Sequence, residues 1–261
     1  MQFGEGYSQG RIQVEGDLPR FVELVYAGLM RTRPDTLSYR LRSWLNTLRR
    51  NGLDRARRNI HHHYDIGNDL FRLFLDRNLM YSSAYYPTAD TDLEAAAEAK
   101  LDRVCRKLDL RADDRVLEIG TGWGSFAIHA ALEYGCRVTT TTLSGKQAGY
   151  ARARVRELGL SDRITVLEQD YRELQGEFDK LVSIEMIEAV GHEYLDTYFR
   201  KCSSLLKPDG ELLIQAITIA DQRYESAKRN VDFIKRYGRV GLLKLHQPAN
   251  GEQAFALLVH G

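Results

Sequence analysis

The middle of the chain shows segments with the strand period of hydrophobic and polar positions alternating with segments that have the helical period. Five short segments are predicted to be strands, at 115–119, 137–142, 164–168, 179–185 and 211–218. Four segments with apolar residues at helical spacing are predicted to be helices, at 91–108, 125–134, 145–158 and 193–206. Strands that alternate with helices predict an α/β fold with a parallel, doubly wound sheet and right-handed crossovers.

Polar residues at fixed spacing predict where two of these helices begin and end. Thr91 and Glu94 have the spacing of a capping box before the first helix, and Ser144 and Gln147 have it before the third. Gly159 predicts the end of the third helix because glycine readily adopts the left-handed conformation found there.

The first 60 residues have a different character. Residues 1–16 predict a strand or two with glycine turns, and Asp17 predicts the cap of a helix over 17–29. The stretch 31–60 then holds nine arginines against two aspartates, with leucines at helical spacing. A basic amphipathic helix of this kind suits an anionic membrane surface, and it equally suits a solvated helix that packs its apolar stripe on the next domain. Nucleic acid is a distant third alternative.

Composition narrows the class of protein. The 37 basic and 36 acidic residues nearly cancel, so the overall charge gives no argument for nucleic-acid binding. Cys105, Cys136 and Cys202 are widely separated, which predicts a reducing compartment and neither a disulfide framework nor a metal knuckle. The histidines at 61–63 have no complete set of partner ligands, so no metal is predicted. A polar start and the lack of an 18-residue apolar run predict a cytoplasmic protein without a membrane span.

The stretch RVLEIGTGWG at 115–124 predicts a buried strand that turns through three glycines into a helix. Its G-x-G-x-G spacing differs from the G-x-G-x-x-G of a dinucleotide site, and threonines stand at 139–142 where such a site places an acid. NAD is therefore disfavoured and S-adenosylmethionine (SAM) favoured. The strand ends place Glu118, Thr142, Asp170 and Glu188 along one edge of the sheet, where the ligand is expected.

Several motifs in order along the chain resemble one family. They are His62, Tyr64, Asp65, Gly67 and Asn68, the segment YSSAY at 81–85, the turn EIGTGWG, Thr142-Leu143-Ser144 with Gln147, and VSIEMIEAVG at 182–191. Together they resemble cyclopropane-fatty-acyl-phospholipid synthases and the mycolic acid cyclopropane synthases, from residue 1 to Tyr237. The resemblance implies a Rossmann-like class I SAM-dependent methyltransferase fold with a helical N-terminal lid. It also implies methylene transfer to a cis double bond of a phospholipid acyl chain, through a carbocation that bound bicarbonate deprotonates.

The same resemblance assigns roles to individual residues. The resemblance places Tyr81, Ser82, Gly120, Gly122, Thr142, Gln147, Asp170 and Tyr171 at the SAM site. The strand and glycine turn add Glu118, Thr121 and Gly124 to the cofactor-binding set. The catalytic set around the bicarbonate is Glu188, Ser83, Gln215 and Ile217, in which Ser83 replaces a cysteine of the family and Gln215 replaces a histidine. Both replacements can still hydrogen-bond an anion. The aromatic residues expected to enclose a carbocation are Phe71, Phe74, Tyr81, Tyr85 and Tyr86.

The resemblance also divides the chain. Residues 1–50 match a remnant of an N-terminal lipid-binding domain, 51–108 a helical lid and linker, 109–237 the SAM-dependent methyltransferase domain, and 238–261 an atypical C-terminal tail. The expectation is a chain truncated at both ends, whose tail adds one strand at most and whose five-stranded sheet leaves an edge exposed.

Three functions stay open at this point. They are cyclopropane fatty acid synthesis, SAM-dependent methylation of another small molecule, and a catalytically impaired fragment that binds SAM. The expected partners are an unsaturated acyl chain and the inner face of the membrane, with peripheral association, and a homodimer is compatible with the sequence.

Overall fold

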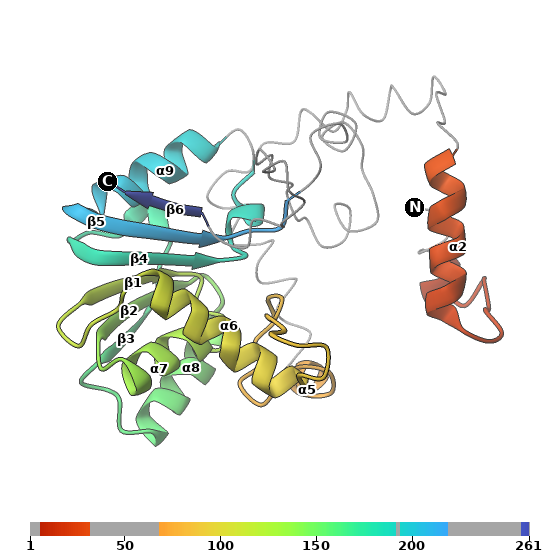
Figure 1. Cartoon of the computed structure of the whole chain (residues 1–261), viewed down its shortest axis with the longest axis horizontal. Helices are drawn as coiled ribbons and strands as arrows, with labels where there is room; N and C mark the ends of the chain where they lie inside the picture. Colours follow the sequence, from red (N-terminus) through yellow and green to blue (C-terminus); the bar gives the residue numbers. More distant parts are fainter. Residues whose placement is uncertain (1–5, 32–67, 192–193, 219–256, 261) are drawn as a thin grey trace. The chain divides into compact units, whose positions relative to one another are not determined.

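The computed structural model describes residues 6–31, 68–191, 194–218 and 257–260 (Figure 1). The chain divides into two compact units, one of residues 1–50 with 222–240 and one of residues 51–221 with 241–261. Each unit is described by itself. The basic stretch 32–60 and the histidines at 61–63 lie outside the described residues, so the predictions made for them stay predictions.

The described part of the first unit is a helix with a turn before it. Helix α2 spans Leu18–Arg31, and the Asp17 carboxylate accepts a hydrogen bond from Arg20 N at 3.2 Å, so the predicted cap is confirmed. The strand expected within 1–16 is wrong for residues 6–16, which form a helical turn followed by bends. Two amides, those of Arg11 and Ile12, donate to the carbonyl of Gly6, and these local bonds take the place of a strand partner.

The second unit is built on a sheet of six strands in the order β3-β2-β1-β4-β5-β6. Their bounds are β1 Arg115–Ile119, β2 Arg137–Thr142, β3 Ile164–Glu168, β4 Phe178–Ile184, β5 Leu206–Gln215 and β6 Leu257–His260. The first five are parallel and β6 pairs antiparallel with β5. The predicted parallel α/β sheet is confirmed, and the described residues of the tail, 257–260, add one strand to it. Because β6 covers β5, the expected exposed edge of a five-stranded sheet is wrong on that side.

The four helices predicted for this unit lie close to their predicted positions, and one short helix, at 68–72, was not predicted. They are α5 Asn68–Arg72, α6 Leu93–Lys107, α7 Ser125–Glu133, α8 Gly145–Glu157 and α9 Leu195–Ser204, with short 3₁₀ turns η1 Tyr171–Glu173 and η2 Ile187–Ala189. The capping box predicted at the start of α6 is wrong. Asp92 is the N-cap and accepts from Ala95 N at 2.8 Å, whereas the Thr91 hydroxyl accepts from Thr88 N. The Glu94 carboxylate accepts from Arg77 N at 2.8 Å.

The core forms on both faces of the sheet because successive strand residues point to opposite sides. Val116 packs with the buried residues of α6, α7 and α8, whereas its neighbour Leu117 packs with Tyr198 and Cys202 of α9. Burial on both sides fixes the register of β1, since a slip of one residue would exchange the two faces. The carboxyl ends of the strands are thereby held at one edge.

Three further observations bear on function. All three cysteines are buried and free, and burial raises the pKa of the Cys202 thiol to about 12, which makes it unreactive. Within the described ranges, no helix is long and apolar enough to cross a bilayer. The same ranges contain no cluster of His, Cys, Asp and Glu side chains that could hold a metal ion.

Candidate functional site

The turn after β1 brings the backbone close to the space where a ligand is expected. Gly120, Gly122 and Gly124 all have positive φ, at 107°, 53° and 89°, which side chains with a Cβ rarely adopt. The amides of Gly120 and Thr121 both donate to the carbonyl of Thr141 at 3.0 Å, which fastens the turn to the end of β2. A Cβ on Gly120 would lie 3.2 Å from the Met186 side chain, whereas one on Gly122 would meet no atom within 4 Å. Gly122 therefore borders open space.

Glu118 lies directly under this turn and is only 3% exposed. Its Oε2 accepts a hydrogen bond from the Thr140 hydroxyl at 2.6 Å, and the Thr140 and Thr121 hydroxyls are 2.8 Å apart. Burial raises the pKa of Glu118 to about 8, while Thr140 and the nearby charge of Lys100 lower it. At neutral pH a protonated Glu118 is therefore favoured, and it becomes an acceptor-only group when it ionises.

The end of β2 holds the start of α8. The Ser144 hydroxyl accepts from Gln147 N at 3.3 Å, so the predicted cap is confirmed. The Gln147 side chain does not return to the Ser144 amide as a capping box requires. Instead its Oε1 accepts from the Thr142 hydroxyl at 2.9 Å, and that hydroxyl accepts from Ser144 N at 3.1 Å. Gly159 follows α8 with a φ of 68°, as predicted.

Asp170 and Tyr171 follow β3. The Asp170 carboxylate accepts from the amide, Nε and Nη2 of Arg172 at 2.7–3.0 Å, so much of its acceptor capacity is used within the chain. The Tyr171 ring packs edge-on against Tyr198 of α9, 5.4 Å between centroids, and burial raises its pKa to about 12.

The segment before residue 90 packs against the glycine turn. The Phe71 ring lies 4.7 Å from the Trp123 ring, and Tyr81 lies edge-on to Phe71 at 5.3 Å. The Ser125 hydroxyl, at the start of α7, donates to the carbonyl of Asn78 at 2.5 Å. The described part of the predicted lid is thus in contact with the predicted cofactor turn.

The aromatic residues expected to line the site differ in their exposure and contacts. Phe71 is buried against Trp123, so part of its role is core packing. Phe74, Tyr81 and Tyr86 are about half exposed. Tyr85 lies under the Arg103 guanidinium, 4.4 Å from its ring centroid.

Lys100 is a site residue that the sequence reasoning missed. It is 4% exposed, and its ammonium donates to the Ser82 hydroxyl at 2.5 Å. Burial lowers its pKa to about 8, and the charges of Glu185, Asp76 and Glu118 pull the value back up. The sequence did contain an indication that Lys100 is special, because residue 100 falls on the apolar face of α6, where a lysine is unusual.

Ser83 and Gln215 meet at a second missed residue, Glu185. The Glu185 Oε1 accepts from Ser83 N at 3.0 Å, from the Ser83 hydroxyl at 2.7 Å and from Gln215 Nε2 at 2.9 Å. Gln215 Nε2 also lies 3.1 Å from the Ser83 hydroxyl. Glu185 has a φ of 47°, which is rare for a residue with a side chain. The sequence feature that could have identified Glu185 is an acidic residue directly after a buried strand.

Glu188 and Ile217 form the adjacent contact. The Ile217 amide donates to Glu188 Oε1 at 2.5 Å, while Glu188 Oε2 is buried and has no hydrogen-bond partner among the described residues. Burial raises the pKa of Glu188, and the neighbouring Glu185 charge raises it further. All four predicted catalytic residues therefore lie in two adjacent contacts at the carboxyl edge.

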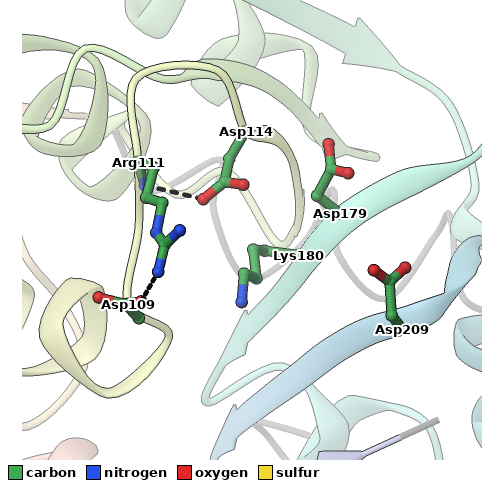
Figure 2. A pocket seen from close by; sticks show the side chains of 6 residues that line it. All are labelled: Asp109, Arg111, Asp114, Asp179, Lys180 and Asp209. Carbon is green, nitrogen blue, oxygen red and sulfur yellow. Dashed lines mark hydrogen bonds and ion pairs between the residues drawn. The ribbon is translucent and has the colours of Figure 1, made fainter.

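A pocket also exists at the opposite edge, where β1 and β4 begin. Figure 2 shows the six side chains that line it, Asp109, Arg111, Asp114, Asp179, Lys180 and Asp209. Charges of this region are paired within the chain: Arg111 with Asp109, Lys180 with Glu211, and Lys207 with Asp179. The glycine turn and the Glu185 contacts lie at the other end of the strands, so we place the candidate site there.

Comparison with known proteins gives matches over most of the chain. A family model described as mycolic acid cyclopropane synthetase matches residues 51–239. The tuberculostearic acid methyltransferase UfaA1 of Mycobacterium tuberculosis is 39% identical over 250 residues, 90% of this chain and 57% of its own length. The cyclopropane-fatty-acyl-phospholipid synthase of Escherichia coli K12 is 44% identical over 155 residues, 59% of this chain and 39% of its own length. The chain thus spans about half the length of these relatives, or less.

Two solved structures have a similar fold. The cyclopropane synthase MmaA2 from Mycobacterium tuberculosis superposes with a TM-score of 0.66 at 29% identity, covering 72% of this chain and 70% of that one. The mycolic acid cyclopropane synthase CmaA1, complexed with SAH and CTAB, has a TM-score of 0.62 at 33% identity, covering 70% and 64%. The Rossmann-like class I SAM-dependent methyltransferase fold expected from the sequence is confirmed.

Proposed function

The chain belongs to the mycolic acid cyclopropane synthetase family, and from that premise we propose that it transfers a one-carbon unit from SAM to the cis double bond of an unsaturated phospholipid acyl chain. The observation that carries the proposal is the contact between the lid segment and the carboxyl edge. Ser83 is bonded to Glu185 and Gln215, and Tyr81 packs beside Phe71 and the glycine turn. A lid that closes on the cofactor edge is what a reaction requiring exclusion of water needs.

The residues at the glycine turn fit SAM. The open space beside Gly122 would receive the cofactor, and the hydroxyl and amide groups of Thr142 and Gln147 offer polar partners at the neighbouring strand end. The SAH-bound CmaA1 structure supports this placement by its likeness. When bound, SAM supplies an electrophilic methyl group. The task of the protein is then to hold the double bond in line with it, because an alkene is a poor nucleophile.

The substrate class follows from the relatives and from the apolar lid. The curated relatives include a tuberculostearic acid methyltransferase, a probable fatty acid methyltransferase of Pseudomonas putida and sphingolipid C9-methyltransferases, whose names all refer to lipids. Phe74, Tyr81 and Tyr86 of this chain offer half-exposed aromatic surface, and Tyr81 lies edge-on to Trp123 of the turn. Their π faces would stabilise positive charge on the acyl chain.

Methyl addition to a double bond leaves a carbocation, and closing the ring requires a base. The family resemblance implies a bicarbonate ion held by Ser83, Gln215, Glu188 and Ile217. In this chain the Ser83 amide, the Ser83 hydroxyl and Gln215 Nε2 already donate to Glu185, and the Ile217 amide donates to Glu188. The N–H and hydroxyl donors of Ser83, Gln215 and Ile217 are thus engaged with carboxyl oxygens, and an added anion would lie beside the carboxyl groups of Glu185 and Glu188. The residues present therefore do not fit a bicarbonate ion.

The experiment that tests the function is incubation of the chain with methyl-labelled SAM and vesicles of unsaturated phospholipid. Label in the lipid, lost when saturated phospholipid is substituted, supports the proposal. Label in another small molecule would instead support a SAM-dependent methyltransferase of a different class. SAM binding without any transfer would support a catalytically impaired SAM-binding fragment.

The proposed location is the cytoplasmic side of the membrane, with peripheral association of the chain, and a homodimer is the proposed assembly. A lipid substrate requires at least transient contact with a bilayer, and the basic stretch 31–60 offers positive charge for an anionic surface. Co-sedimentation with anionic and with neutral vesicles tests the first point, and the mass in solution tests the second.

A further inference from the structure

The structure assigns to the Glu185 carboxylate the place that bicarbonate would hold, and we propose that Glu185 is the base that takes the proton from the carbocation. This inference rests on the proposed one-carbon transfer. It replaces a bound ion by a side chain, so that the reaction needs no added anion. Two of the four residues expected to hold an anion, Ser83 and Gln215, are the ones that hold Glu185.

Of the two carboxylate oxygens of Glu185, one accepts hydrogen bonds from the protein and the other accepts none from the described residues. Oε1 accepts three hydrogen bonds, two from Ser83 and one from Gln215. Oε2 accepts none from any described residue. Three donors hold the carboxylate in one orientation, and the second oxygen keeps its capacity to accept a proton.

The backbone supports the same reading. Glu185 has a φ of 47°, a left-handed conformation that costs a residue with a side chain roughly 1–2 kcal/mol, and glycine would adopt it freely. The Glu185 amide donates to the carbonyl of Gln215 at 2.8 Å, which holds this conformation at the end of β4. Strained residues persist where the surroundings hold them, and they concentrate at functional sites. Because the backbone at this position favours glycine, the presence of a carboxylate there indicates that the carboxylate has a function.

The proposed step balances without another reagent. The alkene carbon has already formed a bond with the methyl carbon of the sulfonium donor, and the positive charge lies on the adjacent chain carbon. A C–H bond of the new methyl group breaks, and its electron pair forms the bond that closes the three-membered ring. The proton passes to Glu185 Oε2 and from there to water.

A purely structural role is the alternative, in which Glu185 only fastens the lid through Ser83. Glu185→Gln separates the two roles, because the glutamine Oε1 can accept the same three hydrogen bonds while its amide nitrogen cannot take a proton. Glu185→Gly removes the carboxylate, relieves the backbone and frees the donors of Ser83 and Gln215. Glu157→Gln, at the exposed end of α8, is the matched control for loss of a carboxylate.

The first measurement is label transfer in buffer freed of carbon dioxide. We expect wild type and Glu157→Gln to be equally active with and without bicarbonate. We expect Glu185→Gln to lose at least about a hundredfold in kcat, the range for a general base, with SAM affinity within a few-fold. Glu185→Gly should be inactive until millimolar bicarbonate is added. Wild-type activity that needs bicarbonate, or full activity of Glu185→Gln, would overturn the inference.

The second measurement needs no turnover. Binding of ¹³C-labelled bicarbonate to the chain with SAH bound is followed by carbon NMR. Wild type should not bind it, and Glu185→Gly should gain binding. Bicarbonate binding to wild type, or none to Glu185→Gly, contradicts the assignment of Glu185 to the anion position. If no variant transfers label to lipid, the proposed function fails, and this binding result still decides whether Glu185 occupies the anion position.

Discussion

Gly122→Ala tests whether the open space at the glycine turn belongs to the cofactor. Gly122 has a φ of 53°, and a Cβ placed on it meets no atom within 4 Å. Gly159, after α8, offers a matched control because its φ is 68° and its Cβ also meets nothing. For each variant the left-handed backbone costs about 1–2 kcal/mol, and each kcal/mol lowers Tm by about 2–4 °C in a chain of this size.

The two variants should therefore lose similar stability and differ in binding. We expect both to lower Tm by roughly 2–8 °C, measured by circular dichroism without ligand. Only Gly122→Ala should weaken SAM binding, by tenfold or more in calorimetry, since its methyl group enters the space that SAM would fill. If Gly122→Ala binds SAM as wild type does, or if both variants weaken binding equally, the turn does not serve the cofactor in this way.

Three other predictions use single substitutions. Trp123→Ala should lower the free energy of unfolding by about 3–5 kcal/mol in urea denaturation, because the buried indole packs on Phe71 and Tyr81; a loss below 1 kcal/mol would contradict this packing. Burial raises the pKa of Glu118 to about 8, so the folded state binds the extra proton and stability falls as the pH rises from about 5 to 8. Glu118→Gln should show a shallower fall, and an unchanged slope would argue against the burial effect. Glu188→Gln should abolish label transfer with SAM affinity within a few-fold, whereas equal loss of both would mean that Glu188 serves the cofactor.

The strands and helices of the second unit could be predicted because each has a local pattern. The strand at 115–119 has apolar residues at Val116, Leu117 and Ile119, and the glycines after it adopt positive φ, so both the strand and its turn are visible in the sequence. The cap of α6 was predicted at the wrong residue for a local reason. Thr91 and Asp92 are adjacent residues that can each cap a helix, and only the backbone conformation decides that Asp92 does.

The site could be predicted only in part, because its remaining contacts join distant segments. Ser83 and Glu185 are 102 residues apart and Gln215 is 132 residues from Ser83, so nothing local indicates that they meet. The family resemblance identified Ser83 and Gln215 as site residues and implied that they are ligands of a bound bicarbonate ion. Glu185, which joins them, lies within the motif VSIEMIEAVG at 182–191, but the sequence reasoning gave it no role. Lys100 was missed because a lysine within a helix is usually solvated.

The distribution of charge at the carboxyl edge bears on which reaction the site suits. Burial raises the pKa of Glu118 to about 8, which favours its neutral form at neutral pH, and burial also raises the pKa of Glu188. Lys100 keeps a positive charge below about pH 8. The charge of the nearby Glu185 raises the pKa of Lys100. A sulfonium donor and a carbocation would each bring positive charge into this region, and that charge would weaken protonation of Lys100 and favour ionisation of the carboxyl groups. Binding of SAM should therefore be accompanied by proton release near pH 8. Such a release would support a site arranged for developing positive charge rather than for a bound anion, and its absence would argue against one.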